Sequence, residues 1–259
     1  APTGGSMILA GLLLKLGAYG FIRLVIPFFP EESARYAGVM ALFATLAIIF
    51  GAMSAFAQKD LKRLVAYSSI NHMGFVMLGI AAVAKVWQST DQNLLLSANV
   101  ALNGSILQMF NHGLTSAGMF FLVGVIYERT HTRILDEMGG LWSYVPKYGA
   151  IFVFTSFAAL GLPGLNGFVS EFLVVRGSWG IFPLFTFLSM IGLFFTGVYV
   201  LKAIAKMLQG PRNESMHAIE EIRSREVWVI APLMALMLLI GIWPASLLNL
   251  INYAVNLLF

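Results

Sequence analysis

The sequence predicts an all-α protein, a polytopic transmembrane helix bundle of about seven spans, one of which is broken near the middle of the membrane. Of the 259 residues, 59% are hydrophobic and only 11% are charged. Soluble domains carry about 25% charged residues, so this composition excludes a soluble globular protein. The apolar residues form continuous runs rather than an alternating pattern, which favours helices over a β-barrel.

Charge and cysteine content narrow the function classes. The net charge of +4 comes from 16 basic and 12 acidic residues that lie scattered between the apolar runs. We therefore exclude disorder and nucleic-acid binding, which need charge gathered in a tail or patch. The sequence contains no cysteine, so it offers no thiolate ligand or thiol nucleophile. Its first residues do not resemble a secretory signal.

Patterns that bind nucleotides or metals are also missing from the sequence. His131 and His217 lie in different polar loops without the spacing of metal ligands. No Gly-x-Gly-x-x-Gly or Walker pattern occurs at a strand-to-helix turn. We therefore expect this chain to bind no metal and no cofactor.

Seven apolar runs are long enough to cross a bilayer, which takes about 20 residues each. They cover residues 5–27, 34–57, 61–84, 98–127, 148–177, 181–207 and 226–243. Residues 128–147 mix charged and apolar side chains, which predicts an amphipathic helix or turn on the cytoplasmic side of the membrane. Residues 245–259 carry no charged side chain and predict an apolar C-terminal tail along the far interface.

Basic residues are unevenly divided between the two sides of this bundle. Eleven of the 16 lie in or near the loops that follow the second, fourth and sixth spans, and four lie on the other side. By the positive-inside rule, the loops richer in basic residues face the cytoplasm, the matrix or the stroma. The C-terminus at Phe259 is then expected on the opposite side.

The first span has a lysine at its centre. Lys15 lies about 15 Å from either end, where a lysine costs about 3 kcal/mol to insert. A partner or a hydrated cavity must offset this cost, unless the side chain bends outward to a headgroup. Tyr19 and Arg23 follow at i+4 and i+8 and extend one polar stripe toward the far face.

The fifth span is too long for one straight helix and contains Gly161, Pro163, Gly164 and Gly167. Glycine weakens a helix and proline removes a backbone donor, so we expect a break in this span. Broken helices line ion paths in transporters, because irregular backbone at this depth must be covered by protein or water. Glu171 follows the break, which favours a functional break over a simple packing kink.

The fourth span carries Gln108, Asn111, His112 and Thr115, whose spacing of i, i+3, i+4 and i+7 puts them on one face. Histidine titrates near neutral pH and is suited to carrying protons. The alternative is a histidine held by interhelical hydrogen bonds without a relay role.

A shorter polar pair lies on the third span. Ser68 and His72 are four residues apart, and Asn71 lies beside them. For this pair we favour a structural role, because a contact with a surface group near the end of the span would explain it.

Short motifs along almost the whole chain resemble the antiporter-like membrane subunits of respiratory complex I. They include Leu-Leu-Lys-Leu-Gly-Ala-Tyr-Gly at 13–20 and Gln-Met-Phe-Asn-His-Gly at 108–113, and the others lie at 1–6, 60–69, 72–75, 127–133, 138–141, 161–164 and 167–172. A glutamate at position 171 resembles the M-type subunit, the type of mitochondrial subunit 4. The L- and N-type subunits and the large subunit of sodium/proton antiporters usually have lysine there.

The resemblance implies a fold and a set of residue roles. Residues 1–259 are similar to helices eight to fourteen of a fourteen-helix subunit, including the second of its inverted repeats, so we expect a single transmembrane domain that is a fragment of a longer subunit. Lys15 corresponds to the central membrane lysine, His112 to the middle of the relay and Glu171 to its last group. The secondary polar path is then formed by Tyr19, Arg23, Ser68, His72, Gln108, Asn111 and Thr115.

The resemblance also implies the surroundings of the chain. Other membrane subunits are expected on both flanks, with a lateral amphipathic helix and lipid, and the NADH, flavin, iron–sulfur clusters and quinone are expected in partner subunits. The location is then the bacterial cytoplasmic membrane, or else the mitochondrial inner or thylakoid membrane.

Three other functions remain open at the level of sequence. A subunit of a multi-subunit cation/proton antiporter would share the relay but tend toward lysine at position 171. A subunit of a membrane-bound hydrogenase would also share it. A seven-helix receptor fits only the number of spans, because it gives no role to a central lysine, histidine and glutamate.

Overall fold

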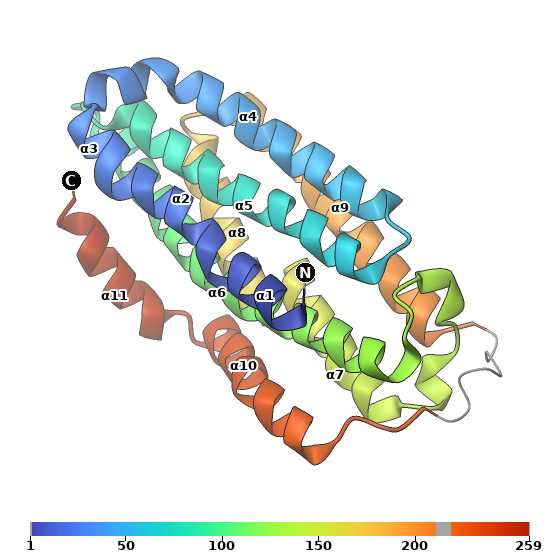
Figure 1. Cartoon of the computed structure of the whole chain (residues 1–259). Helices are drawn as coiled ribbons and strands as arrows, with labels where there is room; N and C mark the ends of the chain where they lie inside the picture. The colour runs from blue at the N-terminus through green and yellow to red at the C-terminus, as the bar shows by residue number, and fades with distance from the viewer. Residues whose placement is uncertain (1, 211–218, 259) are drawn as a thin grey trace.

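The computed structural model describes residues 2–210 and 219–258, and within them it is a bundle of helices without β-strands (Figure 1). The all-α prediction is confirmed. His217 and Phe259 lie outside the described residues. The helical elements are α1 (Thr3–Ile8), η1 (Leu9–Leu13), α2 (Leu14–Gly20), η2 (Phe21–Val25), α3 (Ile26–Phe28), α4 (Pro30–Ala57), α5 (Leu61–Val86), α6 (Gln92–Thr130), η3 (Leu135–Glu137), η4 (Leu141–Ser143), α7 (Pro146–Leu160), α8 (Asn166–Trp179), α9 (Pro183–Leu208), α10 (Ser224–Ile242) and α11 (Ala245–Asn256).

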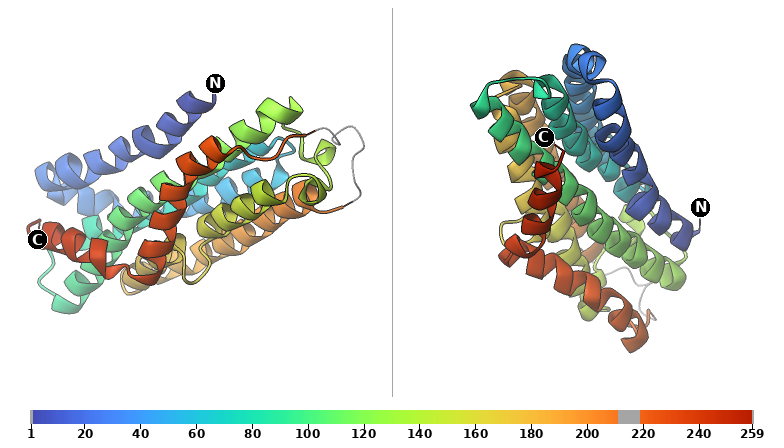
Figure 2. Two further views of the ribbon diagram at one scale, coloured as in Figure 1. Left: turned by 90° about the horizontal axis from the view of Figure 1, so that it is seen from below. Right: turned by 90° about the vertical axis from the view of Figure 1, so that its left-hand side faces the viewer.

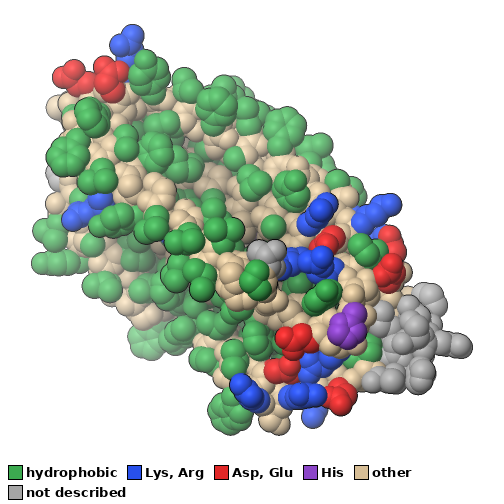
Figure 3. All heavy atoms as spheres, in the orientation of Figure 1, with side chains coloured by type: hydrophobic (Ala, Val, Ile, Leu, Met, Phe, Trp, Pro, Cys, Tyr) green, Lys and Arg blue, Asp and Glu red, His purple; other side chains and the backbone are tan. Residues whose placement is uncertain are grey.

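Six of the predicted spans are continuous helices in the described part of the chain. Each is long and apolar enough to cross a membrane, and they cover Thr3–Phe28, Pro30–Ala57, Leu61–Val86, Gln92–Thr130, Pro183–Leu208 and Ser224–Ile242. The remaining predicted span, the fifth, is divided into α7 and α8. Hydrophobic side chains cover the middle of the face seen in Figure 3, and charged side chains gather at its two ends. This distribution is what a bilayer requires.

α5 and α6 form the centre of the bundle. In their most apolar stretches, 78% and 67% of the residues are buried, against 17% for the N-terminal helix and for α10. These two less buried helices lie on the outside of the bundle (Figure 2). Polar groups carried by α5 and α6 are therefore enclosed by protein, whereas the outer helices offer apolar faces to lipid or to partners.

The N-terminal helix runs from Thr3 to Phe28 and includes two π-helical turns, η1 and η2. A π turn adds a residue to one helical turn, and such turns occur frequently at functional sites. η1 ends at Leu13, two residues before Lys15. The lysine thus follows directly on a local change of helical pitch.

The predicted break in the fifth span is confirmed. α7 ends at Leu160, α8 begins at Asn166, and Gly161 and Gly164 between them have φ values of 83° and 94°. These values lie in the left-handed region, which costs glycine little and other residues more. Gly161 therefore ends α7 in the manner of a glycine C-cap.

Residues 128–147 and the C-terminal segment from residue 245 are both largely ordered into helices and turns. Within residues 128–147, α6 continues to Thr130 and short 3₁₀ turns follow, because Leu135, Met138 and Leu141 are fully buried against the bundle. The C-terminal segment forms a helix, α11. The Asn256 side chain accepts a hydrogen bond of 2.8 Å from Asn99 of α6.

The ends of α6, α7 and α10 are tied together at the more charged end of the bundle. Arg129 donates to both carboxylate oxygens of Glu226, at 2.6 and 3.1 Å, and its side chain is only 11% exposed. It also donates to the backbone carbonyls of Glu220 and Glu221. The Glu221 carboxylate accepts from the Lys147 amide at 2.8 Å and so caps α7.

Breaking the Arg129–Glu226 pair should destabilise the bundle. We expect Arg129→Ala to lower the free energy of unfolding by about 2 kcal/mol, because it leaves a largely buried carboxylate without its partner. The measurement is thermal unfolding of the purified protein in detergent. Lys206→Ala breaks an exposed pair with Asp136 and should cost less than about 1 kcal/mol. Equal losses in the two variants would contradict this account.

Candidate functional site

Lys15 reaches from the N-terminal helix to α6. Its Nζ lies 2.7 Å from Nδ1 of His112 and also donates to the Ala10 carbonyl in the π turn η1. An ammonium group has donors only, so Nδ1 accepts while Lys15 is charged. The partner that offsets the cost of this lysine is therefore an imidazole on the neighbouring helix α6.

His112 uses its second ring nitrogen toward α5. The Nε2 atom lies 3.2 Å from Oγ of Ser69, and the imidazole is 3% exposed. Because Nδ1 accepts from charged Lys15, the ring proton belongs on Nε2 and is donated to the Ser69 hydroxyl. The two nitrogens of His112 thus face two different groups.

His72 and Glu171 form the second pair of the site. His72 Nδ1 lies 2.8 Å from Oε1 of Glu171, and both residues are 4% exposed. The rings of His72 and His112 are 5.6 Å apart between centroids. Four ionisable side chains from the N-terminal helix, α5, α6 and α8 therefore follow one another through the interior of the bundle.

Gln108 adds a donor to Glu171 from α6. Its Nε2 donates to Oε1 of Glu171 at 3.0 Å, and its Oε1 accepts from Ser170 Oγ at 2.5 Å. Asn111 donates to Ser170 Oγ at 2.9 Å and to the Asn166 carbonyl at 2.7 Å. These bonds fasten the start of α8 to α6, so the position of the Glu171 carboxylate is fixed from both helices.

The break beside Glu171 has a steric reason as well as a conformational one. A Cβ placed on Gly161 would lie 3.2 Å from Oε2 of Glu171, and one on Gly167 would overlap the Ala158 carbonyl. Small residues therefore let the end of α7 and the start of α8 approach the carboxylate. Pro163 lies in the turn between the two helices. Because proline has no amide hydrogen to donate, it does not continue either helix.

Tyr199 of α9 lies close to the histidine on α5. Its hydroxyl lies 3.4 Å from Nε2 of His72, and the side chains of Ser68, Asn71 and Thr196 also interact with it. Tyr199 was not among the site residues predicted from the sequence. The available signal was a tyrosine that follows Thr196 by three residues within an otherwise apolar run.

Within the described residues, the side chains of the other predicted site residues form no hydrogen bond with the side chains of Lys15, His72, His112 or Glu171. Tyr19 is 56% exposed and Arg23 is also exposed, so their stripe faces outward from the described chain. Ser68 donates to the Val65 carbonyl at 2.8 Å, and Thr115 donates to the Asn111 carbonyl at 3.1 Å. The structure brings Lys15, His72, Gln108, Asn111, His112 and Glu171 together through side-chain contacts.

Ser69 and Ser170 were also missed by the sequence analysis. Each lies next to a predicted residue, and the sequence gives no signal that distinguishes Ser69 from Ser68. In the residues that the structure describes, no three His, Cys, Asp or Glu side chains lie close enough together to hold a metal ion. The arrangement is chemically suited to passing protons between nitrogen and oxygen atoms.

The chain is similar to known membrane proteins along most of its length. The family model for the NADH:quinone oxidoreductase/Mrp antiporter transmembrane region matches residues 1–199. NADH-quinone oxidoreductase subunit M of Pseudomonas aeruginosa is 43% identical over 249 residues, which are 96% of this chain and 46% of that protein. The chain thus spans about half the length of the curated relatives it matches. The resemblance to M-type subunits is confirmed.

Solved structures have the same fold. A chain of respiratory complex I from Thermus thermophilus with bound NADH matches with a TM-score of 0.85 and 29% identity, over 99% of this chain and 52% of that one. A chain of the Mrp complex from Dietzia matches with a TM-score of 0.80 at 18% identity, over 97% of this chain and 52% of that one. The second likeness concerns the fold alone.

Proposed function

Because the chain belongs to the NADH:quinone oxidoreductase/Mrp antiporter family of membrane proteins, we propose that it forms part of a proton-translocating subunit of an NADH:quinone oxidoreductase. The observation that carries the proposal is the network in which half-buried Lys15 contacts buried His112 and buried His72 contacts buried Glu171. Ionisable groups inside a membrane protein are expensive to bury and commonly mark proton paths.

The proton moves between these groups in steps. Protonated Lys15 gives its proton to Nδ1 of His112, and the resulting imidazolium releases its other proton from Nε2. His72 receives that proton through a bridging water and transfers a proton to the Glu171 carboxylate, which lies 2.8 Å from its ring. Glu171 then releases the proton toward the far side of the membrane. Both histidines are neutral again at the end of the transfer, but each then carries its proton on the other ring nitrogen. Rotation of the ring, or return of the proton through solvent, restores the starting tautomer before the next transfer.

Coupling comes from charge in neighbouring parts of the complex. A positive charge that arrives near Lys15 disfavours its ammonium form and starts the transfer. In this proposal the oxidation of NADH and the reduction of quinone take place in partner subunits, which also hold the flavin and the iron–sulfur clusters. The side chains described above supply proton transfer only.

The proposed surroundings follow from the exposed apolar helices. The N-terminal helix and α10 are largely unburied in the described chain, and we place neighbouring membrane subunits on both flanks, with lipid and a lateral amphipathic helix at the remaining surface. The proposed location is the bacterial cytoplasmic membrane, in line with a relative from Pseudomonas aeruginosa. The more basic end of the bundle then faces the cytoplasm.

The alternatives can be separated by ion dependence and by partners. Membership of the family removes the seven-helix receptor. A cation/proton antiporter or a membrane-bound hydrogenase would use the same relay, but the glutamate at position 171 and the 43% identity with a subunit M favour the oxidoreductase. Proton pumping that required sodium, in a complex without quinone reduction, would favour the antiporter instead.

Removal of the central lysine should stop translocation. In the complete subunit within its assembled complex, we expect Lys15→Ala to reduce the rate of proton pumping to below roughly a tenth of the wild-type rate, because it removes the proton donor to His112. Lys15→Arg keeps the charge but its guanidinium does not release a proton, so it should also lose pumping. Pumping is measured by the quenching of a pH-sensitive dye in vesicles. Lys85→Ala, at an exposed lysine on α5, is the control, and normal pumping by Lys15→Ala would refute the relay.

Neutralising Glu171 tests the other end of the path. We expect Glu171→Gln to assemble normally, because the amide can still hydrogen-bond to His72 and Gln108, but to lower the number of protons moved per electron. Glu171→Asp should retain some activity. The measurement is proton/electron stoichiometry in assembled complexes, with the exposed Glu31→Gln as control. An unchanged ratio in Glu171→Gln would mean that protons leave by another route.

The orientation of the bundle is testable by cysteine labelling. Lys59 precedes α5 and Thr90 follows it, so the length of the helix separates them by about 40 Å, and both are exposed. In oriented vesicles, Lys59→Cys should react with an impermeant thiol reagent only from the cytoplasmic side, and Thr90→Cys only from the other. Labelling of both from the same side would contradict the assignment.

A further inference from the structure

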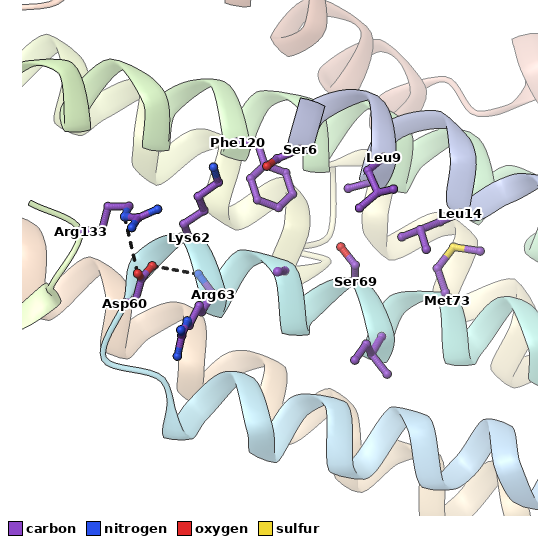
Figure 4. Close-up of a pocket in the computed structure, with 13 residues that line it drawn as sticks. Ser6, Leu9, Leu14, Asp60, Lys62, Arg63, Ser69, Met73, Phe120 and Arg133 are labelled. Carbon is purple, nitrogen blue, oxygen red and sulfur yellow. Dashed lines mark hydrogen bonds and ion pairs between the residues drawn. The ribbon is translucent and has the colours of Figure 1, made fainter. Parts of the chain in front are cut away.

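A groove of about 540 Å³ lies between the N-terminal helix and α5. Its outer end is lined by charged side chains, including Asp60 and Arg133, and its inner end is lined by Ser69 and Met73 (Figure 4). Along α5 these ends are about 20 Å apart. The groove therefore runs from the more charged end of the bundle to the depth of the histidines.

The inner part of the groove touches the relay at one atom. Ser69 lines the groove, and its Oγ lies 3.2 Å from Nε2 of His112. The Ser69 side chain also points from α5 into the space beside the N-terminal helix (Figure 4). Lys15 does not line this groove and contacts the opposite nitrogen of His112. The imidazole thus lies between the lysine and the groove.

The outer end is built to hold water. Asp60 caps α5 by accepting from the Arg63 amide at 3.0 Å, and its other carboxylate oxygen lies 3.6 Å from Nε of Arg133. Lys62 and Arg63 also line this end. Fixed charges at the outer end favour water in the first section, and the Ser69 and Ser6 hydroxyls offer further polar positions along an otherwise apolar wall.

A second groove, on the other side of the N-terminal helix, provides a contrast. It has a larger volume, about 710 Å³, and includes Lys15 and Tyr19, but its other lining residues are apolar or glycine. No charged group lies at its ends among the described residues. Of the two, only the groove along α5 joins a charged end of the bundle to a relay nitrogen.

We propose that the groove along α5 gives water access from the charged end of the bundle to His112, and that Ser69 is the hydroxyl that joins this water to the imidazole. The inference rests on the proposed relay and gives that relay a second connection. When Lys15 has passed its proton to Nδ1, the Nε2 proton moves to Ser69 Oγ while the Ser69 hydroxyl proton moves to a groove water. Histidine becomes neutral and the water becomes hydronium; proton uptake is the reverse.

Access can be tested without reference to transport. The chain has no native cysteine, so Ala66→Cys in the groove can be compared with Tyr67→Cys, which lies at the same depth and outside it. The experiment uses the full subunit within the assembled complex and a charged, impermeant thiol reagent added from the side of the basic loops. We expect Ala66→Cys to react with this reagent roughly tenfold faster than Tyr67→Cys. Equal rates, or reaction of Ala66→Cys with an apolar maleimide alone, would show a lipid-filled groove and overturn the proposal.

The role of Ser69 needs a second measurement. We expect Ser69→Ala to reduce pumping roughly fivefold or more, and Ser69→Thr, which keeps the hydroxyl, to restore it. Ser116→Ala is the matched control, because Ser116 is equally buried, at 4%, and among the described residues its hydroxyl bonds only to the Gly113 carbonyl. Pumping by Ser69→Ala at the wild-type rate, or equal loss in Ser69→Ala and Ser69→Thr, would overturn the role.

The two proposals fail in distinguishable ways. If Lys15→Ala and Glu171→Gln lose pumping while Ser69→Ala does not, the relay stands and its connection through Ser69 is wrong. If Lys15→Ala pumps normally, the relay itself is wrong, and the labelling of Ala66→Cys still reports whether water enters the groove.

Discussion

The position of the helices in this bundle depends on one constraint: an ionisable side chain inside the membrane region must have a partner. Isolated charges at such depth are costly. Lys15 meets His112 across two helices, and His72 meets Glu171 across two more. Because these contacts are short, the N-terminal helix, α5, α6 and α8 are held in register at this level. The same contacts that make burial tolerable also place the groups at distances suited to proton transfer.

The backbone departs from regular α-helix at both ends of this chain of groups. The π turn η1 provides the Ala10 carbonyl that accepts from Lys15, and the break at Gly161 lets α7 end against the Glu171 carboxylate. Irregular backbone in lipid leaves polar groups unpaired and survives only where protein covers it. The polar network supplies part of that cover, since Asn111 of α6 donates to the Asn166 carbonyl at the start of α8.

The sequence was sufficient for the elements but not for their contacts. The continuous apolar runs predicted the spans, and the Gly and Pro cluster predicted the break, because both signals are local. The stripe of Tyr19 and Arg23 was expected to extend the polar path from Lys15, yet it faces outward. Helical periodicity predicts which residues share a face, but it does not predict which neighbouring helix covers that face. Likewise, Ser69 and Tyr199 meet the histidines through packing between helices distant in sequence, which helical spacing within one span does not encode.

The two nitrogens of His112 make it the point at which the paths divide. Nδ1 faces Lys15, while Nε2 faces Ser69 at 3.2 Å and the neighbouring ring of His72 at 5.6 Å between centroids. In this conformation the groove is within direct hydrogen-bond reach of the relay, whereas transfer toward Glu171 requires a bridging water or rotation of a ring. A change that moves His112 from Ser69 toward His72 therefore disconnects one side of the bundle as it connects the other. In the proposed mechanism, that exchange of hydrogen-bond partners would keep the two sides of the membrane from being connected at the same time.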